Sequence, residues 1–363
     1  MAKISISSLE LAAVVNELQF LVGGKLTQIY HQEKKELLFQ LHAQGEGKKL
    51  LKIIPGKYLC LTKIKDDAPL KPSSFCMQLR KYLSNATINS ITQYEADRVV
   101  VIELEKSQKY IMIIELYAKG NLVMTDLDNN IIAALERQTW RDRVVKVGEK
   151  YVFPSHGVNW KDITDEKLLG LLKSSEKNNL ATSLAIELGF GGVYSEEICK
   201  LASVDKSKLP GDVTETEVKI IVKTIGEMLE KLKKPQGYLY DDQITPFSLS
   251  EMTEKERFDS YSAALDTIDP FKTTSPYNNK IKTIMTMIKA QEGSIKKQED
   301  SITINTKKGE TVYAQYQPLH KMLDFVKQSR NDGKEWKEIE EELKKIKKIK
   351  KVDLKSKKII IDL

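Results

Sequence analysis

Cysteine and histidine are scarce in this chain of 363 residues, which contains three cysteines and four histidines. The cysteines, Cys60, Cys76 and Cys199, form no C-x-x-C pair, and the histidines are scattered. Closely spaced pairs of these residues are the usual mark of a zinc site. The sequence therefore predicts no metal site and no cofactor. So few cysteines also argue against a disulfide framework and fit a reducing cytoplasm.

Long apolar runs and an export signal are also lacking. The first residues, Met1–Ser5, carry no apolar segment of the kind found in signal peptides. No stretch of about 18 apolar residues, the length that a membrane helix needs, occurs anywhere in the chain. The sequence therefore predicts a cytoplasmic protein without membrane association.

Arginine is rare as well. Of the 58 lysine and arginine residues only seven are arginine, and five of these lie between Arg80 and Arg143. A guanidinium group binds phosphate or carboxylate through two parallel hydrogen bonds, so the clustering favours a phosphate-rich ligand. The alternative is that the three arginines in 137–143 pair with adjacent acids. The net charge of +7 fits nucleic acid or a merely solvated lysine-rich surface.

The hydrophobic pattern predicts an α+β fold with two or three domains. Apolar residues at helical spacing predict a helix over 7–22, and a second helix is expected over 72–84 with Ser74 as its N-cap. Alternating residues predict strands over 26–30, 36–41, 50–54, 58–62, 88–94, 99–105, 110–115, 121–125 and 131–135. We place the first, β-rich domain at 1–155.

A helical domain is expected over 156–272. Within it, Gly189, Gly191 and Gly192 separate two predicted helices, at 178–188 and 195–202, in a helix–hairpin–helix pattern. Backbone N–H groups at such glycines can approach phosphate oxygens. However, the acids at 196–197 in the following turn would repel a phosphate. The hairpin is therefore either a phosphate contact or a structural turn.

The last third of the chain predicts an antiparallel coiled coil with a helical tip, over 273–352. Isoleucines from Ile281 to Ile295 follow a heptad-like spacing. A break is expected near 305–310, followed by a helix ending at about 328 and another over 336–350. The final segment, 353–363, reads as an unpaired strand, the stub of a following domain.

Two short motifs carry the functional hypothesis. In the first, Arg80 and Lys81 end the helix over 72–84. In the second, Asp97 and Arg98 directly precede the apolar strand 99–102. Neighbouring strand residues point to opposite faces, so this acid and base need not pair with each other. At a strand-entry turn both could face a ligand, or both could be solvated charges.

These motifs, together with 23–30 and 114–123, resemble the NFACT family of RqcH- and NEMF-like ribosome quality control proteins, in its archaeal branch. The resemblance implies a β-sandwich similar to the N-terminal domain of formamidopyrimidine-DNA glycosylases, a helix–hairpin–helix domain and a coiled coil. It implies binding to a large ribosomal subunit that carries a stalled peptidyl-tRNA. It also implies recruitment of charged tRNA, alanyl-tRNA in prokaryotes, for template-free C-terminal tailing. The family's usual C-terminal RNA-binding domain is not expected here.

The resemblance also assigns roles to residues. Asp97 and Arg98 match the tRNA-reading pair, and the remaining expected tRNA-binding residues are Glu10, Glu115, Arg80 and Lys81. An alternative for Arg80 is a salt bridge to an acid of the sheet. The coiled coil would contact ribosomal RNA and stalk-base proteins.

No set of nucleophile, base and orienting group is recognisable, so neither an enzyme nor a small-molecule substrate is expected. The alternatives are a surface fibronectin-binding adhesin and a DNA-binding repair protein. The start of the chain, Met1-Ala2-Lys3, lacks the N-terminal proline nucleophile of the glycosylases, and no zinc finger follows.

Overall fold

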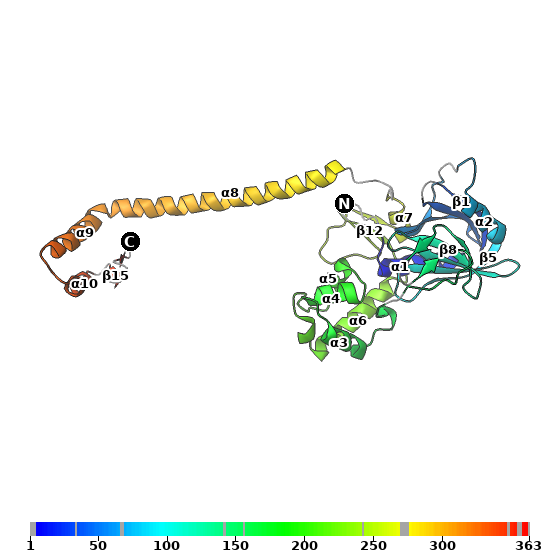
Figure 1. Cartoon of the computed structure of the whole chain (residues 1–363), viewed down its shortest axis with the longest axis horizontal. Coiled ribbons are helices and arrows are strands. Elements are labelled where there is room, and N and C mark those ends of the chain that lie inside the picture. The colour runs from blue at the N-terminus through cyan, green and yellow to red at the C-terminus, as the bar shows by residue number, and fades with distance from the viewer. Residues whose placement is uncertain are drawn as a thin grey trace. The chain divides into compact units, whose positions relative to one another are not determined.

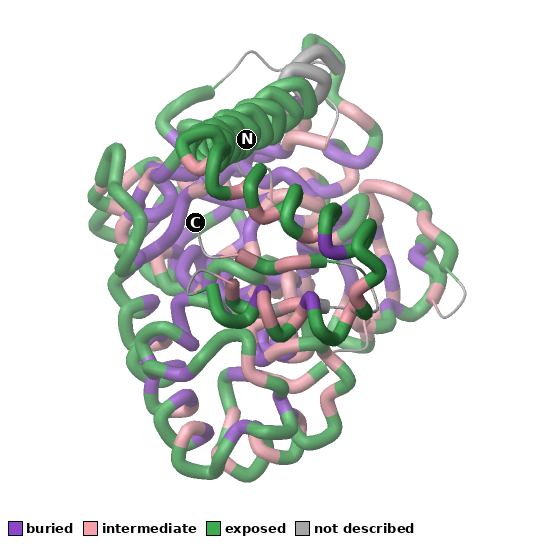
Figure 2. Tube along the Cα trace, turned by 90° about the vertical axis from the view of Figure 1, so that its left-hand side faces the viewer, coloured by how far each residue is buried: buried purple, intermediate pink, exposed green. Residues whose placement is uncertain are grey.

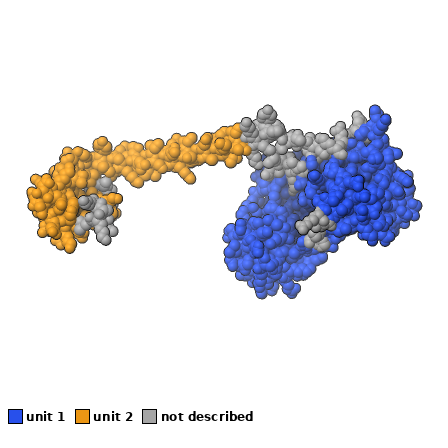
Figure 3. Space-filling view, in the orientation of Figure 1, with its two compact units in different colours: residues 1–271 blue, residues 272–363 orange. Residues whose placement is uncertain are grey.

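The structure is a computed structural model that describes residues 5–32, 35–65, 69–140, 143–154, 157–241, 243–268, 276–346, 349–353 and 358–361. The chain divides into two compact units, residues 1–271 and residues 272–363 (Figure 3). The predicted β-rich and helical domains lie together in the first unit. In the described part of the chain, no helix combines the length and the apolar character needed to cross a bilayer.

The first unit is built on a large antiparallel sheet, and each of the nine predicted strands corresponds to one strand of it. The strands are β1 (Lys25–His31), β2 (Leu37–Ala43), β3 (Gly47–Ile54), β4 (Tyr58–Thr62), β5 (Ala86–Gln93), β6 (Val99–Glu105), β7 (Lys109–Glu115), β8 (Asn121–Thr125) and β9 (Ile131–Ala134). Their order in the sheet is β4-β3-β2-β1-β5-β6-β7-β8-β9. The expected sandwich is therefore one hydrogen-bonded sheet with two halves, β1–β4 and β5–β9. The two halves are joined by only two residue pairs, between β1 and β5.

The two halves of this sheet touch each other again through their turns. The N–H of Gly56, between β3 and β4, donates to the carbonyl of Glu115 at the end of β7 over 2.9 Å. Gly120 lies at φ +65°, and a Cβ built on it would stand 1.9 Å from the Gly56 nitrogen. Only glycine fits this backbone conformation and this close contact. The contact closes the sheet into a sandwich-like shape.

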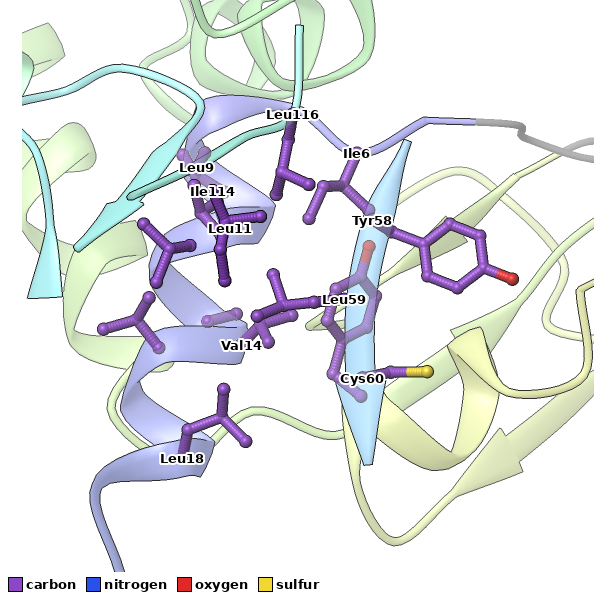
Figure 4. Close-up of a cluster of buried hydrophobic side chains, with 14 of the residues drawn as sticks. Ile6, Leu9, Leu11, Val14, Leu18, Tyr58, Leu59, Cys60, Ile114 and Leu116 are labelled. Carbon is purple, nitrogen blue, oxygen red and sulfur yellow. The ribbon is translucent and has the colours of Figure 1, made fainter. Parts of the chain in front are cut away.

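Helix α1 (Ser8–Glu17) fills the space inside the curved sheet. Its apolar residues Leu9, Leu11 and Val14 are fully buried. Figure 4 shows them facing Leu59 of β4 and Ile114 of β7, which lie far apart in the strand order. Burial of a side chain of this size contributes roughly 1.5–3 kcal/mol, so α1 holds the two halves of the sheet together.

The helical part continues the same core. Its elements are a 3-10 turn (Trp160–Asp162), α3 (Asp165–Ser174), α4 (Leu180–Glu187), α5 (Gly192–Leu201), α6 (Glu215–Lys231), α7 (Tyr261–Leu265) and a small sheet of β12 (Gly237–Leu239), β13 (Ile244–Thr245) and β14 (Glu256–Phe258). Trp160, Phe190 and Tyr194 share one apolar cluster with the large sheet. Figure 1 shows these elements beside α1.

The structure also moves one predicted helix cap and the start of one predicted helix. Helix α2 (Ser74–Leu83) is capped by Ser73, not by Ser74. Helix α5 begins at Gly192 and is capped by Gly191, so Ser195 lies inside the helix and is buried. Glycine at the cap position supplies a positive φ that a serine would adopt only with strain.

The first turn of α6 gives a test of stability. The Glu217 carboxylate accepts hydrogen bonds from the Lys208 ammonium group and from the backbone N–H and hydroxyl of Thr214. These hydrogen bonds lower the pKa of Glu217 to about 2. A lowered folded-state pKa stabilises the fold above the ordinary value of 4.5, and this contribution is lost as the pH falls toward 2. Glu217→Gln is expected to cost about 0.5–1 kcal/mol at neutral pH. Urea unfolding at pH 7 and pH 3 should show the difference from wild type shrinking in acid.

The second unit corrects four predictions. Helix α8 (Pro276–Ala314) runs through the predicted break at 305–310. Its residues from 283 to 314 are all exposed, and the tube in Figure 2 is coloured green there, so no antiparallel partner from the described residues covers it. After α9 (Tyr316–Asn331), helix α10 (Trp336–Lys344) ends before the predicted limit, and Ile349–Asp353 forms strand β15 instead. The expected unpaired strand is β16 (Lys358–Ile361), which pairs with β15.

Candidate nucleic-acid interface

Asp97 and Arg98 lie in the turn between β5 and β6, defined here as the 94–98 turn. The Asp97 N–H donates to the carbonyl of Tyr94 over 3.0 Å, and the Tyr94 N–H donates to that of Val99 over 2.9 Å. Glu95 occupies a left-handed backbone conformation at φ +46°. Both residues of the predicted pair are half-buried, so neither is sealed in the core, although the Oδ2 atom of Asp97 has almost no exposed surface.

Gln93, which the sequence analysis did not predict as a functional residue, holds this turn in place from the core side. Its side chain is 8% exposed. Its Nε2 donates to the carbonyl oxygens of Ser8 and Asp97, each over 2.8 Å. Two hydrogen bonds from one buried amide connect the turn to the start of α1, which makes the position of Asp97 part of the folded core. Glutamine in an alternating strand gives no sequence signal for this role.

The guanidinium group of Arg98 forms no ion pair or hydrogen bond with any residue that the structure describes. The Arg98 backbone is nevertheless held, because its carbonyl accepts the N–H of Leu116 over 2.8 Å. A guanidinium carries five N–H donors in a planar fork. A fixed backbone with free donors at a half-buried position suits a phosphate or a base edge.

Glu10 does not have the predicted role, because it is fully buried. One carboxylate oxygen accepts the N–H of Ser7 over 2.7 Å, which completes the capping box of α1. The other accepts the hydroxyl of Tyr194 from α5. Direct contact with RNA is incompatible with this burial. Glu10 instead joins the start of α1 to the helical part.

Glu115 is also buried, at 1% exposure, so its predicted contact with tRNA is wrong in this structure. Its carboxylate pairs with Arg143 over 2.8 Å and accepts the hydroxyl of Tyr151 over 2.7 Å. Burial raises the pKa of Tyr151, and the Glu115 carboxylate raises it further, so the phenol stays protonated and donates. We call Glu115, Arg143 and Tyr151 the Glu115 cluster.

The Glu115 cluster resolves one question about the clustered arginines. Among the described residues, Arg143 pairs with Glu115 at the end of β7. Its guanidinium also lies 4.5 Å from the ring centre of Trp140 and 5.9 Å from that of Tyr117. Arg141 and Asp142 lie outside the described residues. The cluster lies at the end of β7, where Glu115 is directly opposite Val99 on β6.

Arg80 and Lys81 lie on the last turn of α2, which packs against β1 and β9. The Arg80 Nε donates to the carbonyl of Ile29 over 2.7 Å, and the alternative of a salt bridge to a sheet acid is not formed among the described residues. Lys81 is exposed and stands 5.2 Å from the ring centre of Tyr82. Lys81 therefore remains available for phosphate contact, whereas Arg80 is partly committed to the fold.

The glycine hairpin lies between α4 and α5. Gly189 and Gly191 both have positive φ, at +72° and +79°, and Gly192 is the first residue of α5. The acids of the following turns are held within the chain. Glu196 pairs with Lys206 over 2.7 Å, and Glu197 accepts two hydrogen bonds of 3.0 Å from Ser250. Phosphate contact at this hairpin stays a prediction.

Comparison with known proteins adds a family. A family model described as NFACT N-terminal and middle domains matches residues 7–362. The chain is 30% identical over 366 residues to the archaeal Rqc2 homolog aRqcH of Methanocaldococcus jannaschii, a match that covers 93% of this chain and 54% of that protein. It is 24% identical to the human ribosome quality control complex subunit NEMF, over 92% of this chain and 35% of that protein. The chain thus spans 54% of the length of the archaeal relative and 35% of the length of the human one.

Two solved structures share the fold. The N-terminal part of the fibronectin/fibrinogen-binding protein from Streptococcus suis superposes with a TM-score of 0.60 at 21% identity, covering 72% of this chain and 98% of that one. The fibrinogen-binding protein from Staphylococcus aureus gives a TM-score of 0.60 at 22% identity, covering 72% of this chain and 97% of that one. At these identities the likeness is one of fold.

Proposed function

The chain belongs to the NFACT family, and from this premise we propose that it is a ribosome quality control factor. In this proposal it binds a large ribosomal subunit that carries a stalled peptidyl-tRNA. It recruits charged tRNA, alanyl-tRNA in the first instance, for template-free extension of the nascent chain. Two relatives are named as an Rqc2 homolog and as a ribosome quality control complex subunit, which supports the role.

The observation that carries the proposal is the 94–98 turn. It holds a carboxylate, which only accepts hydrogen bonds, beside a guanidinium, which only donates them. RNA loops expose unpaired base edges next to phosphates, so they offer partners for both groups. We therefore assign tRNA contact to Asp97 and Arg98, with Lys81 as a further phosphate contact, and assign Glu10 and Glu115 to the support of these residues.

The proposed role is positioning and not catalysis. Peptide bond formation would stay with the peptidyl-transferase centre of the ribosome, while this protein places the incoming tRNA. The second unit would reach the ribosomal RNA and the proteins at the stalk base, and the protein would work in the cytoplasm. Helix α8, with 39 residues, would extend about 58 Å at 1.5 Å per residue, a reach that suits this role.

A paired substitution tests this proposal. Asp97→Ala combined with Arg98→Ala is expected to reduce tRNA recovery about 5- to 150-fold, because a good bidentate contact is worth about 1–3 kcal/mol. Recovery of large-subunit RNA should stay near that of wild type. The measurement is affinity purification from cells followed by sequencing of the bound RNA. Arg137→Ala is the control, because Arg137 is an exposed arginine of the same unit.

Unchanged tRNA recovery in the double variant would remove Asp97 and Arg98 from the interface. Absence of both tRNA and ribosomal RNA from the wild-type sample would overturn the proposed function. Display on intact cells, tested by protease protection, would favour the adhesin instead.

A further inference from the structure

Two grooves of the first unit adjoin at Lys233, just beyond the end of α6. The first has a volume of about 480 Å³ and lies between α1, β5 and α6, with Gln93, Trp160 and Lys161 in its lining. The second has a volume of about 500 Å³ and follows the chain from Glu230 to Ser248 around the end of the helix. We call these two the α6 grooves.

The charge of the α6 grooves is strongly one-sided. The charged residues that line them are Lys161, Lys231, Lys233, Lys234 and Glu230. Glu230 is bound to Lys233 over 2.7 Å, so this pair is neutral and three lysines remain. The groove beside the start of α5 is different, because its lining contains three glutamates and two lysines. A polyanion therefore fits the α6 grooves better than the glycine hairpin.

Lysines near the end of a helix also compensate its dipole, but α6 has another partner there. The carbonyl of Leu232, the C-cap residue, accepts the Asn16 side-chain amide over 2.8 Å. Lys231 lies 5.7 Å from the ring centre of Phe247, which keeps its ammonium group over an aromatic surface beside the groove. Lys231 and Lys234 are both exposed, so their ammonium groups are available to a ligand.

Lys161 is an exposed residue whose ammonium group lies against the protein at one side of the groove. Burial of its ammonium group lowers the pKa of Lys161, although Glu95 and Asp162 partly oppose this effect. The ammonium donates to the carbonyl of Gln93 over 3.4 Å, a long hydrogen bond, and lies 5.7 Å from the ring centre of Trp160. The ammonium group carries three N–H donors, so the donors that Gln93 does not use can bind a phosphate oxygen in the groove.

One of the α6 grooves reaches the 94–98 turn at Gln93, which lines the groove and directly precedes the turn. Gln93 connects them, because its backbone carbonyl faces Lys161 and its side-chain amide binds the carbonyl of Asp97. Asn159, just before Trp160, also binds the carboxylate of Glu95 over 2.6 Å. A ligand that contacts Arg98 can therefore continue onto Lys161 and then onto the lysines beyond α6.

We propose that the α6 grooves bind the phosphodiester backbone of RNA and extend the interface that begins at Arg98. This inference rests on the proposed function and adds a second contact region to it. The contacts are those of ammonium groups with phosphates, so they add affinity and salt dependence but no sequence preference.

A neutralised variant tests the proposal. Lys161→Gln, Lys231→Gln and Lys234→Gln are combined in the full chain, and a matched control combines Lys173→Gln, Lys177→Gln and Lys219→Gln, which line neither groove. Filter binding measures the affinity for a tRNA transcript and, separately, for deproteinised large-subunit RNA over a range of salt concentrations. Each lost phosphate contact lowers the slope of log affinity against log salt by roughly 0.7–0.9. The groove variant should lose about 2 from this slope, while the control keeps the wild-type value.

The two RNA arms identify the source of the phosphates. A reduced slope with tRNA supports the proposal, whether or not the slope with large-subunit RNA also falls. A reduced slope with large-subunit RNA alone would assign the grooves to ribosomal RNA and overturn the proposal that they extend the tRNA contact at Arg98. Equal slopes for the groove variant and the control would overturn it, while a loss of affinity in Arg98→Ala would leave the proposed function standing. Failure of the wild-type chain to bind either RNA would overturn both.

Discussion

Glu115→Leu is expected to destabilise the first unit by about 3–5 kcal/mol, because it leaves the Arg143 charge buried without its partner. Glu115 and Arg143 side chains are 1% and 9% exposed. The substitution also removes the acceptor of the Tyr151 hydroxyl. Breaking such a pair costs far more than the pair contributes, since an uncompensated buried charge remains. Urea unfolding followed by circular dichroism should show a large fall in the midpoint.

A second substitution separates the charge from the packing. In Glu115→Leu combined with Arg143→Met both charges are gone, so most of the lost stability should return. Glu136→Leu is the control, because its ion pair with Lys35 is exposed at 39% and 27% and should contribute at most about 1 kcal/mol. Equal losses for Glu115→Leu and Glu136→Leu would show that the Glu115 cluster does not stabilise the fold.

The Glu115 cluster also shows where sequence reasoning stops. Strand β7 was predictable because alternation is local, and Glu115 stood out as an acid at its end. The partner Arg143 is distant in the chain and becomes a neighbour only because the segment after β9 covers the outer face of β6–β9. An exposed ligand contact and a buried ion pair use the same residue types, so the sequence could not separate them.

Glu10 illustrates the same limit through capping. The series Ser7–Glu10 is a capping box that the sequence contains, and the structure forms it. The burial of Glu10 depends on Tyr194, which the helical part brings against α1. Contacts between parts that are distant in sequence therefore decided which acids support the site and which residues, such as Arg98, remain free.

The strand over 349–353 was missed for a different reason. The segment reads Ile349-Lys350-Lys351-Val352-Asp353, which shows no alternation, and the spacing of isoleucines at 339, 346 and 349 fits a helix. The segment forms a strand because β16 pairs with it, with Val352 opposite Ile359. A short apolar run is ambiguous between helix and strand until its partner is known.

Gly120→Ala is expected to produce the largest loss of stability among single glycine substitutions in the first unit, above about 4 kcal/mol. Two costs combine at this position. The residue lies at φ +65°, where a side chain costs about 1–3 kcal/mol. The added Cβ would also stand 1.9 Å from the nitrogen of Gly56, a backbone atom that cannot move aside without opening the sheet.

Other glycines provide a graded control. Gly148→Ala has the strain alone, since its φ is +89° and nothing lies within 4 Å of the added carbon. Gly56→Ala is intermediate, with φ +82° and backbone atoms at 3.0 Å. Chemical unfolding should rank the losses Gly148, Gly56, Gly120 in increasing order. Equal losses at all three positions would mean that the close contact contributes nothing beyond φ strain.

This ranking also connects stability to the proposed interface. The Gly56 N–H donates to the Glu115 carbonyl, and the next N–H, of Leu116, donates to the carbonyl of Arg98. Opening the contact at Gly120 would therefore release the end of β7 that holds the backbone of Arg98. At a temperature where Gly120→Ala remains folded, its affinity for tRNA should fall together with that of Arg98→Ala, while Gly148→Ala should bind as wild type does. Wild-type affinity in a folded Gly120→Ala variant would show that Arg98 acts without this support.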